Sequence, residues 1–285
     1  MRNPALPIGI FDSGVGGLTV YRALHECLPS EHFVYLGDTA RVPYGTKSLS
    51  TVERYAIENS KFLESHGIKL LVVACNTASA LALPAIRDAV GVPVIGVIDP
   101  GARAAVTVAA GKKIAVIATE ATVQSGAYSS AIAGIDPQID VVVRACPLFV
   151  SLAEEGWAET VVARKVAEQY LDDLAKGDIG ALVLGCTHYP ILRGVIGEII
   201  GREVPLIDSG EATAREVQTL LESSELSSPN PSSDTRERQL CDDLDHFYVT
   251  DAAERFARVA ERFLGTAPSV LEAVEVWGHD ELRTY

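Results

Sequence analysis

Basic residues are scarce in this chain of 285 residues. It has 24 Lys and Arg against 38 Asp and Glu, a formal net charge of −14 and a sequence pI of about 4.9. Proteins that bind a phosphate backbone need clustered Lys and Arg, so we expect no direct binding of nucleic acid. A small anionic ligand is compatible with this charge, because backbone dipoles can attract an anion locally.

Long apolar runs are also absent. A membrane span needs about 18 or more residues free of charged and turn residues, and the sequence contains no such run. The opening MRNPALPIGIFDSG lacks the apolar run and small-residue cleavage site of a signal peptide. We therefore expect a cytoplasmic protein without a membrane segment. Its length is natural for two domains of ordinary size.

Sequence patterns for metals, disulfides and common cofactors are missing. The five cysteines are odd in number, widely spaced and without a CxxC pair, which argues against disulfides and a zinc site. The glycine-rich turn at 14–17 forms neither GxGxxG nor a GK[ST] ending, and no Lys motif indicates a Schiff base. We therefore expect no metal site. Cys27, Cys146 and Cys241 are interpreted as buried apolar residues.

Short apolar runs alternate with stretches of helical length. Eight runs rich in Val and Ile are mostly apolar on both faces, as buried parallel strands are: residues 8–11, 32–37, 70–75, 92–97, 113–119, 139–145, 181–186 and 204–208. Amphipathic helices are predicted between them, for example over 50–66 and 157–176. This alternation predicts an α/β protein with parallel-type sheets flanked by helices.

Two short motifs recur in the two halves. A Cys-containing turn (ACNTAS at 74–79, GCTHYP at 185–190) and a DSG turn (12–14, 208–210) each follow a predicted strand. This weak repeat predicts two similar, pseudo-twofold related domains that face each other. Predicted breaks at Asp99-Pro100-Gly101 and Ser209-Gly210 give a first domain of 1–98 plus 210–285 and a second of 99–209.

The tail after residue 210 is too small for a separate domain, so we expect it to pack on the first one. It is predicted to contain a helix over 211–225, a polar linker over 227–238, a strand at HFYVT and a helix over 252–264. The composition of the linker is typical of turns and disorder.

The two Cys-containing turns carry the candidate chemistry. Cys75 and Cys186 each end a predicted strand, at the carboxyl edge where open α/β sheets bind ligands. Backbone N–H groups at the following helix starts favour a carboxylate or a thiolate, and His188 can assist proton transfer. Taken singly, each cysteine can equally be a buried structural residue beside an ordinary helix cap. Because the sequence has such a site in each half, a purely structural role for both cysteines is less plausible than for one alone.

Two further turns follow predicted strands. In FDSGVGG, Asp12 would repel a phosphate, so it suits an ammonium group or a proton-relay partner for a thiol; the alternative is a helix N-cap. Gly16 and Gly17 are interpreted as structural, for close packing or positive φ. The loop Pro43-Tyr44-Gly45 can cover a small-molecule pocket with backbone donors, or be a plain turn.

These motifs, in this order and spacing, resemble the glutamate racemase family of bacterial cell-wall synthesis, within the Asp/Glu racemase superfamily. The resemblance extends from FDSGVGG through GDTARVPYG, ACNTAS, PLFVSLAEEG and GCTHYP to IDSG. Aspartate and hydantoin racemases share the paired cysteines, whereas the longer FDSGVGG and DTARVPYG signatures are similar to the glutamate branch. The resemblance implies two α/β domains with the site between them, no cofactor, and D-glutamate made for peptidoglycan.

The resemblance also implies roles for single residues. Cys75 and Cys186 would be the catalytic pair, with Cys186 taking the proton from L-glutamate and Cys75 from D-glutamate. Asp12 and His188 resemble auxiliary groups of these cysteines. Glu154 matches a further acidic auxiliary, with adjacent Glu155 as the competing match and a solvated helix-end carboxylate as the alternative. The implied substrate-binding pairs are Asp12-Ser13, Tyr44-Gly45, Asn76-Thr77 and Thr187-His188.

Two opposed thiols suit racemisation, because a single base would have to swing across the α-carbon. The ordinary thiol pKa of about 8.5 puts a thiolate within reach at neutral pH. One cysteine must start as thiolate and the other as thiol, and the two swap when the direction reverses. Positioned acid/base groups contribute about 10²- to 10⁴-fold, so carbanion stabilisation and exclusion of water must supply the rest.

Two alternatives stay open at this point. The same machinery can racemise aspartate or a hydantoin. The chain can also be a racemase-fold protein with an added role in inhibiting a partner such as DNA gyrase, which some family members bind. Family members are often dimers, so we expect a homodimer. The predicted partner is a small-molecule substrate, glutamate, with neither nucleic acid nor membrane.

Overall fold

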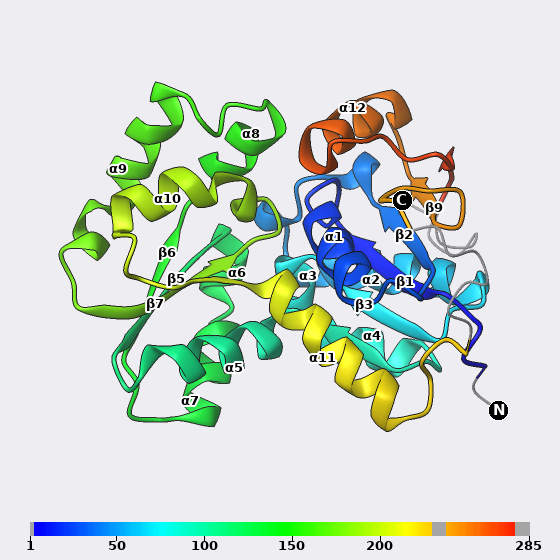
Figure 1. Ribbon diagram of the computed structural model, residues 1–285, viewed down its shortest axis with the longest axis horizontal. Helices are drawn as coiled ribbons and strands as arrows, with labels where there is room; N and C mark the ends of the chain where they lie inside the picture. Colours follow the sequence, from blue (N-terminus) through cyan, green and yellow to red (C-terminus); the bar gives the residue numbers. More distant parts are fainter. Residues whose placement is uncertain (1–2, 230–237, 277–285) are drawn as a thin grey trace.

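The computed structural model describes residues 3–229 and 238–276, which form two β-sheets with helices packed around them (Figure 1). The strands are β1 Ile8–Asp12, β2 Phe33–Gly37, β3 Leu70–Val73, β4 Val94–Gly96, β5 Lys113–Ala118, β6 Val141–Ala145, β7 Ile179–Gly185, β8 Leu206–Asp208, β9 His246–Val249 and β10 Leu271–Ala273.

The helices lie mostly between consecutive strands. The α-helices are α1 Leu18–Cys27, α2 Leu49–Ser65, α3 Asn76–Leu81, α4 Leu83–Ala89, α5 Ile98–Ala109, α6 Glu120–Gln124, α7 Ala127–Ile135, α8 Leu148–Glu154, α9 Val161–Ala175, α10 Arg193–Ile200, α11 Ser209–Ser223 and α12 Ala253–Leu264. Short 3₁₀ helices are η1 Thr39–Arg41, η2 Tyr44–Thr46 and η3 Tyr189–Leu192. None of the described helices is both long and apolar enough to cross a bilayer.

Both sheets have parallel strands in the same order. The first sheet has the order β10-β9-β2-β1-β3-β4 and the second β6-β5-β7-β8. Four consecutive strands form a repeated unit, β1–β4 in the first sheet and β5–β8 in the second. In each unit the first strand lies between the second and the third, and the fourth lies beyond the third. The predicted α/β class and the similarity of the two halves are therefore confirmed. All nine predicted strands, the eight apolar runs and HFYVT, are present as well, and β10 is an addition.

The repeat is carried by the strand order and the two Cys-containing turns. Cys75 follows β3 and Cys186 follows β7, the third strand of each unit. The DSG turns are not equivalent, because Asp12 ends the first strand of its unit whereas Asp208 ends the fourth. The topological counterpart of Asp12 is the end of β5, next to Thr119. Pairing the two DSG turns was therefore wrong.

The two predicted breaks are helix starts. Asp99-Pro100-Gly101 lies in the first turn of α5, where proline is tolerated because the N–H groups have no helical partner anyway. Ser209-Gly210 opens α11, which packs against both α1 and α5. The first sheet uses residues 8–96 and 246–273, and the second uses 113–208. The division into 1–98 plus 210–285 and 99–209 stays a prediction, and most of the linker 227–238 lies outside the described residues.

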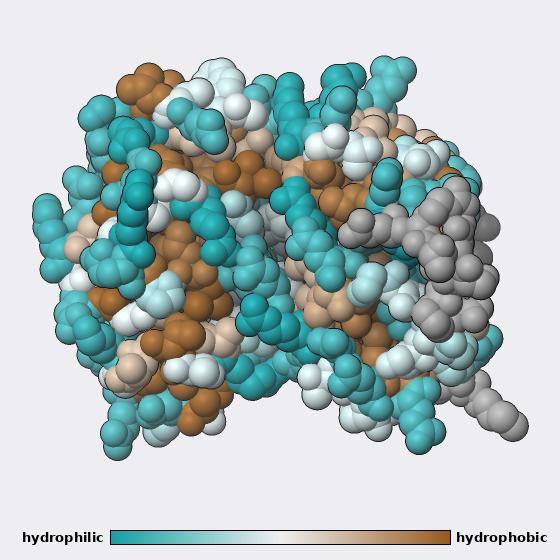
Figure 2. Space-filling model, in the orientation of Figure 1, coloured by the Kyte–Doolittle hydropathy of each residue, from teal (hydrophilic) through white to brown (hydrophobic). Residues whose placement is uncertain are grey.

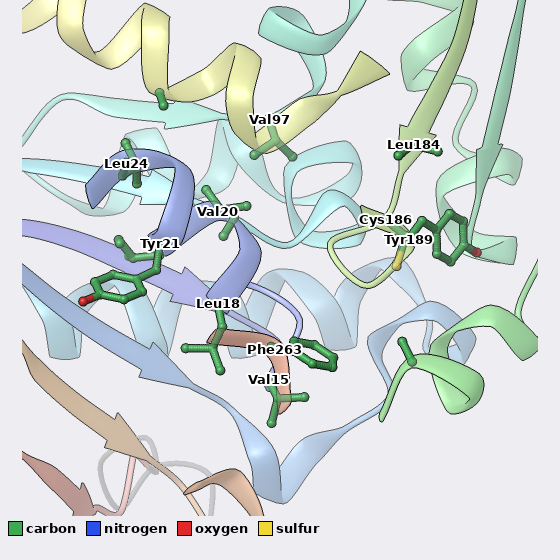
Figure 3. Packing of buried hydrophobic residues seen from close by; sticks show 14 of the residues in the cluster. Val15, Leu18, Val20, Tyr21, Leu24, Val97, Leu184, Cys186, Tyr189 and Phe263 are labelled. Atoms are coloured by element: carbon green, nitrogen blue, oxygen red, sulfur yellow. The ribbon is translucent and has the colours of Figure 1, made fainter. Parts of the chain in front are cut away.

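Apolar packing holds the two sheets in place. The largest buried cluster includes Ile10 of β1 and Leu184 of β7, so it continues from one sheet to the other. Figure 3 shows Cys186 and Tyr189, which follow β7, in the same cluster as Val15, which lies in the turn before α1. Burying one such side chain fully contributes about 1.5–3 kcal/mol. On the face seen in Figure 2, hydrophilic residues cover much of the outside.

Helix α12 is positioned by its apolar stripe. Phe256, Val259, Ala260 and Phe263 are buried, and their spacing places them on one face. The chain leaves the helix at Gly265, whose φ of +81° suits a glycine. The charged residues of α12 are therefore left on its outer sides.

Candidate active site

A small cavity lies at the carboxyl ends of the central strands of both sheets. Ser13 follows β1, Cys75 follows β3, Thr119 follows β5 and Cys186 follows β7, and all four line it. In this strand order the winding direction reverses between the first and third strands, which is where doubly wound sheets bind ligands. The cavity holds about 70 Å³, which is room for only a few water molecules.

Most of the predicted site residues meet there. The cavity is lined by Ser13, Gly14, Val42, Pro43, Tyr44, Gly45, Cys75, Asn76, Thr77, Thr119, Val150, Glu154, Cys186, Thr187 and His188. Asp12 is fully buried and does not line it. Sequence reasoning missed Val42, Thr119 and Val150. Of these, only Thr119 had a usable signal, its place at the end of a predicted strand.

Cys75 caps the helix that follows it. Strand β3 ends at Val73, and the Cys75 Sγ accepts a hydrogen bond from the Ala78 N–H at 3.5 Å and donates to the Ser13 Oγ at 3.2 Å. Burial, together with the nearby charge of Asp12, raises the pKa of the Cys75 thiol to about 12. Cys75 is therefore a thiol at neutral pH in the free protein.

Cys186 has a different environment, because an imidazole lies beside it. The Cys186 Sγ is 3.8 Å from the His188 Nδ1, and the His188 Nε2 is 3.1 Å from the Glu154 Oε1. Burial opposes a charge on His188, but the hydrogen bonds and negative charges of Cys186 and Glu154 prevail and raise the His188 pKa to about 10. An imidazolium at this place stabilises negative charge on Cys186.

Glu154 is the acidic residue that reaches the cavity. Its carboxylate bonds His188, and adjacent Glu155 is not among the lining residues. Burial favours the neutral acid, yet the hydrogen bond and charge of His188 and the charge of Arg255 hold the pKa of Glu154 below its ordinary value. Glu154 is therefore ionised at neutral pH and is not a freely solvated carboxylate.

Asp12 lies under the glycine-rich turn. Its Oδ2 accepts the Gly14 N–H at 2.9 Å, and its Oδ1 has no partner among the described residues. Helix α1 is capped at Gly17 without any side-chain bond, so the N-cap alternative for Asp12 is wrong. Burial raises the pKa of Asp12 against the opposing charge of His188.

Close approach explains the two adjacent glycines. A Cβ on Gly16 would lie 2.2 Å from the Thr187 Oγ1, and one on Gly17 would lie 2.4 Å from the Asp12 Cβ. Neither glycine has a positive φ. The turn after β1 therefore packs directly onto the turn after β7.

The loop at Tyr44 and Gly45 is anchored from behind. The Tyr44 hydroxyl donates to the buried Asp38, which also accepts the Arg41 Nε at 2.7 Å and the Asn59 Nδ2 at 3.1 Å. The phenol is thus engaged away from the ligand. Because Tyr44 and Gly45 line the cavity, their backbone is what the loop offers to a ligand.

Asn76 and Thr77 connect the two halves across the site. The Asn76 Nδ2 donates to the Tyr128 hydroxyl at 2.9 Å, and the Thr77 Oγ1 is 2.9 Å from the Thr119 Oγ1. The buried Asn76 Oδ1 has no partner among the residues described. An unpaired buried acceptor of this kind is costly unless a ligand donor reaches it.

Proteins of similar sequence and fold identify the family of this chain. The model of the Asp/Glu/hydantoin racemase family matches residues 8–217. The chain belongs to this family. A glutamate racemase of Geobacter metallireducens is 52% identical over 262 residues, which are 92% of this chain and 94% of the relative.

Solved structures of glutamate racemases share the fold of this family member. An isoform from Bacillus anthracis superposes with a TM-score of 0.88 at 39% identity, covering 96% of this chain and 98% of the other. A glutamate racemase from Francisella tularensis, solved with D-glutamate, has a TM-score of 0.86 at 39% identity and the same coverage.

In this member of the racemase family, the lining is rich in neutral donors. None of the described residues around the cavity is Lys or Arg, so His188 is its one candidate cation. Hydroxyl groups come from Ser13, Thr77, Thr119 and Thr187. No group of three His, Cys, Asp or Glu side chains in the described ranges is placed to bind a metal.

Proposed function

We propose that the protein is a cofactor-independent glutamate racemase that moves the α-proton between Cys75 and Cys186 and supplies D-glutamate for peptidoglycan. The observation that carries this proposal is the pair of thiols after the third strand of each sheet, which line one small cavity. The glutamate racemases of similar sequence and fold support glutamate over aspartate or a hydantoin.

The environments of the two thiols suit a two-base transfer. With L-glutamate, the Cys186 thiolate takes the α-proton, and the electron pair of the C–H bond stays on the substrate. The Cys75 thiol then donates its proton to the opposite face. The product is D-glutamate, with Cys186 as thiol and Cys75 as thiolate, and the reverse reaction restores the start. The raised pKa of Cys75 supports a free protein in which Cys75 is a thiol, which is the form needed for L-glutamate.

Binding relies on fixed neutral groups. The hydroxyls of Ser13, Thr77 and Thr187 can donate to the substrate carboxylates, and the unpaired Asn76 Oδ1 can accept from the ammonium group. Such preoriented donors stabilise charge that develops in the transition state at no cost in reorganisation. A cavity of this size leaves little room for water around bound glutamate, which strengthens each of these interactions.

Proton exchange at the α-carbon tests the function. The purified protein is incubated with L-glutamate in D₂O without any added cofactor, and optical rotation and the α-proton signal are followed together. We expect both to decay, with deuterium at the α-carbon of the D-glutamate formed. Exchange of L-aspartate or a hydantoin in place of glutamate would show that the proposed substrate is wrong.

Serine variants separate catalysis from folding. Cys75→Ser keeps a side-chain acceptor for the Ala78 N–H, since serine is a good helix cap, but its hydroxyl does not ionise near neutral pH. We expect racemisation to fall by at least about 10³-fold, within the range of positioned acid/base groups. Full activity in this variant would exclude the two-thiol mechanism.

We also propose that the protein works as a homodimer in the cytoplasm, as its family resemblance implies. Light scattering after size-exclusion chromatography should then give twice the chain mass of 30.4 kDa. A mass of one chain at micromolar concentration would contradict the dimer. Fractionation of cells that express the untagged protein tests the location.

A further inference from the structure

Helix α12 belongs to the first sheet but contacts residues beside Cys186, which follows a strand of the second sheet. This helix connects β9 and β10 of the first sheet, whereas Glu154 ends α8, between strands of the second. The Arg255 Nη2 lies 2.9 Å from the Glu154 Oε2, and the Arg262 Nη1 donates to the Glu154 carbonyl at 2.6 Å. Two guanidinium groups of one helix therefore hold one residue of the site.

The Glu154 carboxylate is shared between two partners. Its Oε2 faces Arg255, and its Oε1 faces the His188 Nε2 at 3.1 Å, so each oxygen is engaged. On the other side of the ring, the His188 Nδ1 faces Cys186 at 3.8 Å. The guanidinium, carboxylate, imidazole and thiol thus form one continuous chain of contacts.

Helix α12 also packs against the His188 imidazole. The ring of Phe263 lies edge-on to the ring of His188, with centroids 6.1 Å apart and an interplanar angle of 88°. Figure 3 shows Phe263 packed near Val15, below the turn that carries Cys186. Helix α12 therefore makes three contacts with these groups: with the Glu154 carboxylate, with the Glu154 carbonyl and with the His188 ring.

We infer that Arg255 is a positioning residue, which acts through Glu154 to hold the His188 ring against Cys186. The inference rests on the proposed function, because it assigns Arg255 a part in proton transfer at Cys186. Arg255 itself does not line the cavity and touches no reacting atom.

A purely stabilising role does not explain the pair. The Arg255 side chain is 57% exposed, and exposed ion pairs contribute little to folding. Its charge has a local effect instead. The groups that face Glu154 are His188, Arg255 and Arg262, and those that face His188 are Glu154, Cys186 and Asp12. Without Arg255 the Glu154 Oε2 loses this partner, and the carboxylate is free to rotate. The Glu154 pKa then rises, because the positive charge that lowered it is gone.

The test compares Arg255→Gln with Arg258→Gln. Arg258 is exposed on the same helix and forms no ion pair within the described ranges, so it is a matched control. For Arg255→Gln we expect a loss of about two- to fivefold in kcat, as for one partly exposed charge pair, with KM unchanged. We expect the acid limb of the pH profile to move to higher pH. Arg255→Lys should restore most of the activity, and Arg258→Gln should behave as the wild type.

A double-mutant cycle shows whether Arg255 acts through Glu154. In a Glu154→Gln background, Arg255→Gln should cause no further loss, since the carboxylate it orients is gone. An equal loss in both backgrounds, or an equal loss in Arg258→Gln, would overturn the inference. Because the two enantiomers have equal free energy, kcat/KM must fall by the same factor in both directions, which checks each measurement.

A readout without turnover separates this inference from the proposed function. The solvent exchange of the His188 ring N–H is followed by NMR without substrate, and the signal is assigned by its absence in His188→Asn. We expect Arg255→Gln to speed this exchange by about the same two- to fivefold, and unchanged exchange would overturn the inference. A wild type that does not racemise glutamate would instead overturn the proposed function, while this exchange still decides the role of Arg255.

Discussion

The ionisation of Cys75 in the free protein is the sharpest quantitative consequence of the site. The side chain is 5% exposed, and its burial beside Asp12 raises the thiol pKa to about 12. At pH 8 only about one molecule in ten thousand would carry the thiolate. Since the thiolate is the reactive form, alkylation of Cys75 at pH 8 should be slower than that of a fully ionised thiol by a similar factor.

The assay measures alkylation by iodoacetamide between pH 7 and 11, with the Cys75 peptide followed by mass spectrometry. We expect the rate to rise about tenfold for each pH unit, with no plateau below about pH 11. The same peptide in urea-unfolded protein is the control, and its rate should level off above the ordinary thiol pKa. In Asp12→Asn the folded curve should move to lower pH, because a negative charge near the thiol is removed.

A plateau at or below pH 9 in the folded protein would refute this reasoning. It would mean that the hydrogen bonds with Ser13 and Ala78 outweigh burial and that Cys75 is ionised before substrate binds. The free protein would then not be in the form ready for L-glutamate. A curve that rises to pH 11 would instead mean that Cys75 waits as the proton donor.

Three further predictions concern packing, charge and anchoring. Gly16→Ala should abolish activity, because its Cβ would lie 2.2 Å from a neighbouring hydroxyl oxygen, whereas Gly134→Ala, in open space on a helix, should keep activity and gain about 0.5–1 kcal/mol of stability. His188 has a higher pKa folded (about 10) than unfolded (6.5), so it stabilises the protein fully below pH 6.5, and its stabilisation of up to about 5 kcal/mol should disappear as the pH rises through 10. Urea unfolding of the wild type and His188→Asn across this range checks the sign, and a constant difference between them would contradict it. Asp38→Ala removes the buried carboxylate that accepts hydrogen bonds from Arg41, Tyr44 and Asn59, so urea unfolding should show a loss of about 3–5 kcal/mol of stability and a raised KM, and a loss below 1 kcal/mol would contradict the anchoring of the loop.

Much of the fold was predictable because buried parallel strands leave a strong pattern. Runs such as IGIF and LLVV are apolar on both faces, and they are strands β1 and β3 in the structure. Strand β10 was not predictable, because LEA is three residues long, partly exposed and contains a charge. The predicted break at Asp99-Pro100-Gly101 coincides with the first turn of α5, because proline is common both at breaks and in the first turn of a helix, and the sequence alone does not separate the two.

The site was predictable where a residue directly follows a strand. Cys75, Cys186 and Ser13 have that position, and Thr119 shared the signal without being chosen. Val150 lies on a helix and carries no sign of its place in the sequence. Arg255 is 101 residues from Glu154, so nothing local in the sequence could indicate their contact.

The pairing of β2 with β9 has a consequence for how the chain is made. Strand β9 begins at His246, which is 209 residues after β2 ends at Gly37 (246 minus 37). During synthesis the outer edge of β2 therefore stays without its neighbour until most of the chain has emerged, and an open strand edge invites pairing with other chains. The second sheet, over 113–208, is contiguous and can form earlier. Chains interrupted before residue 246 would thus have a complete second sheet and a first sheet in which the outer edge of β2 is unpaired. Such chains are candidates for aggregation and for chaperone capture.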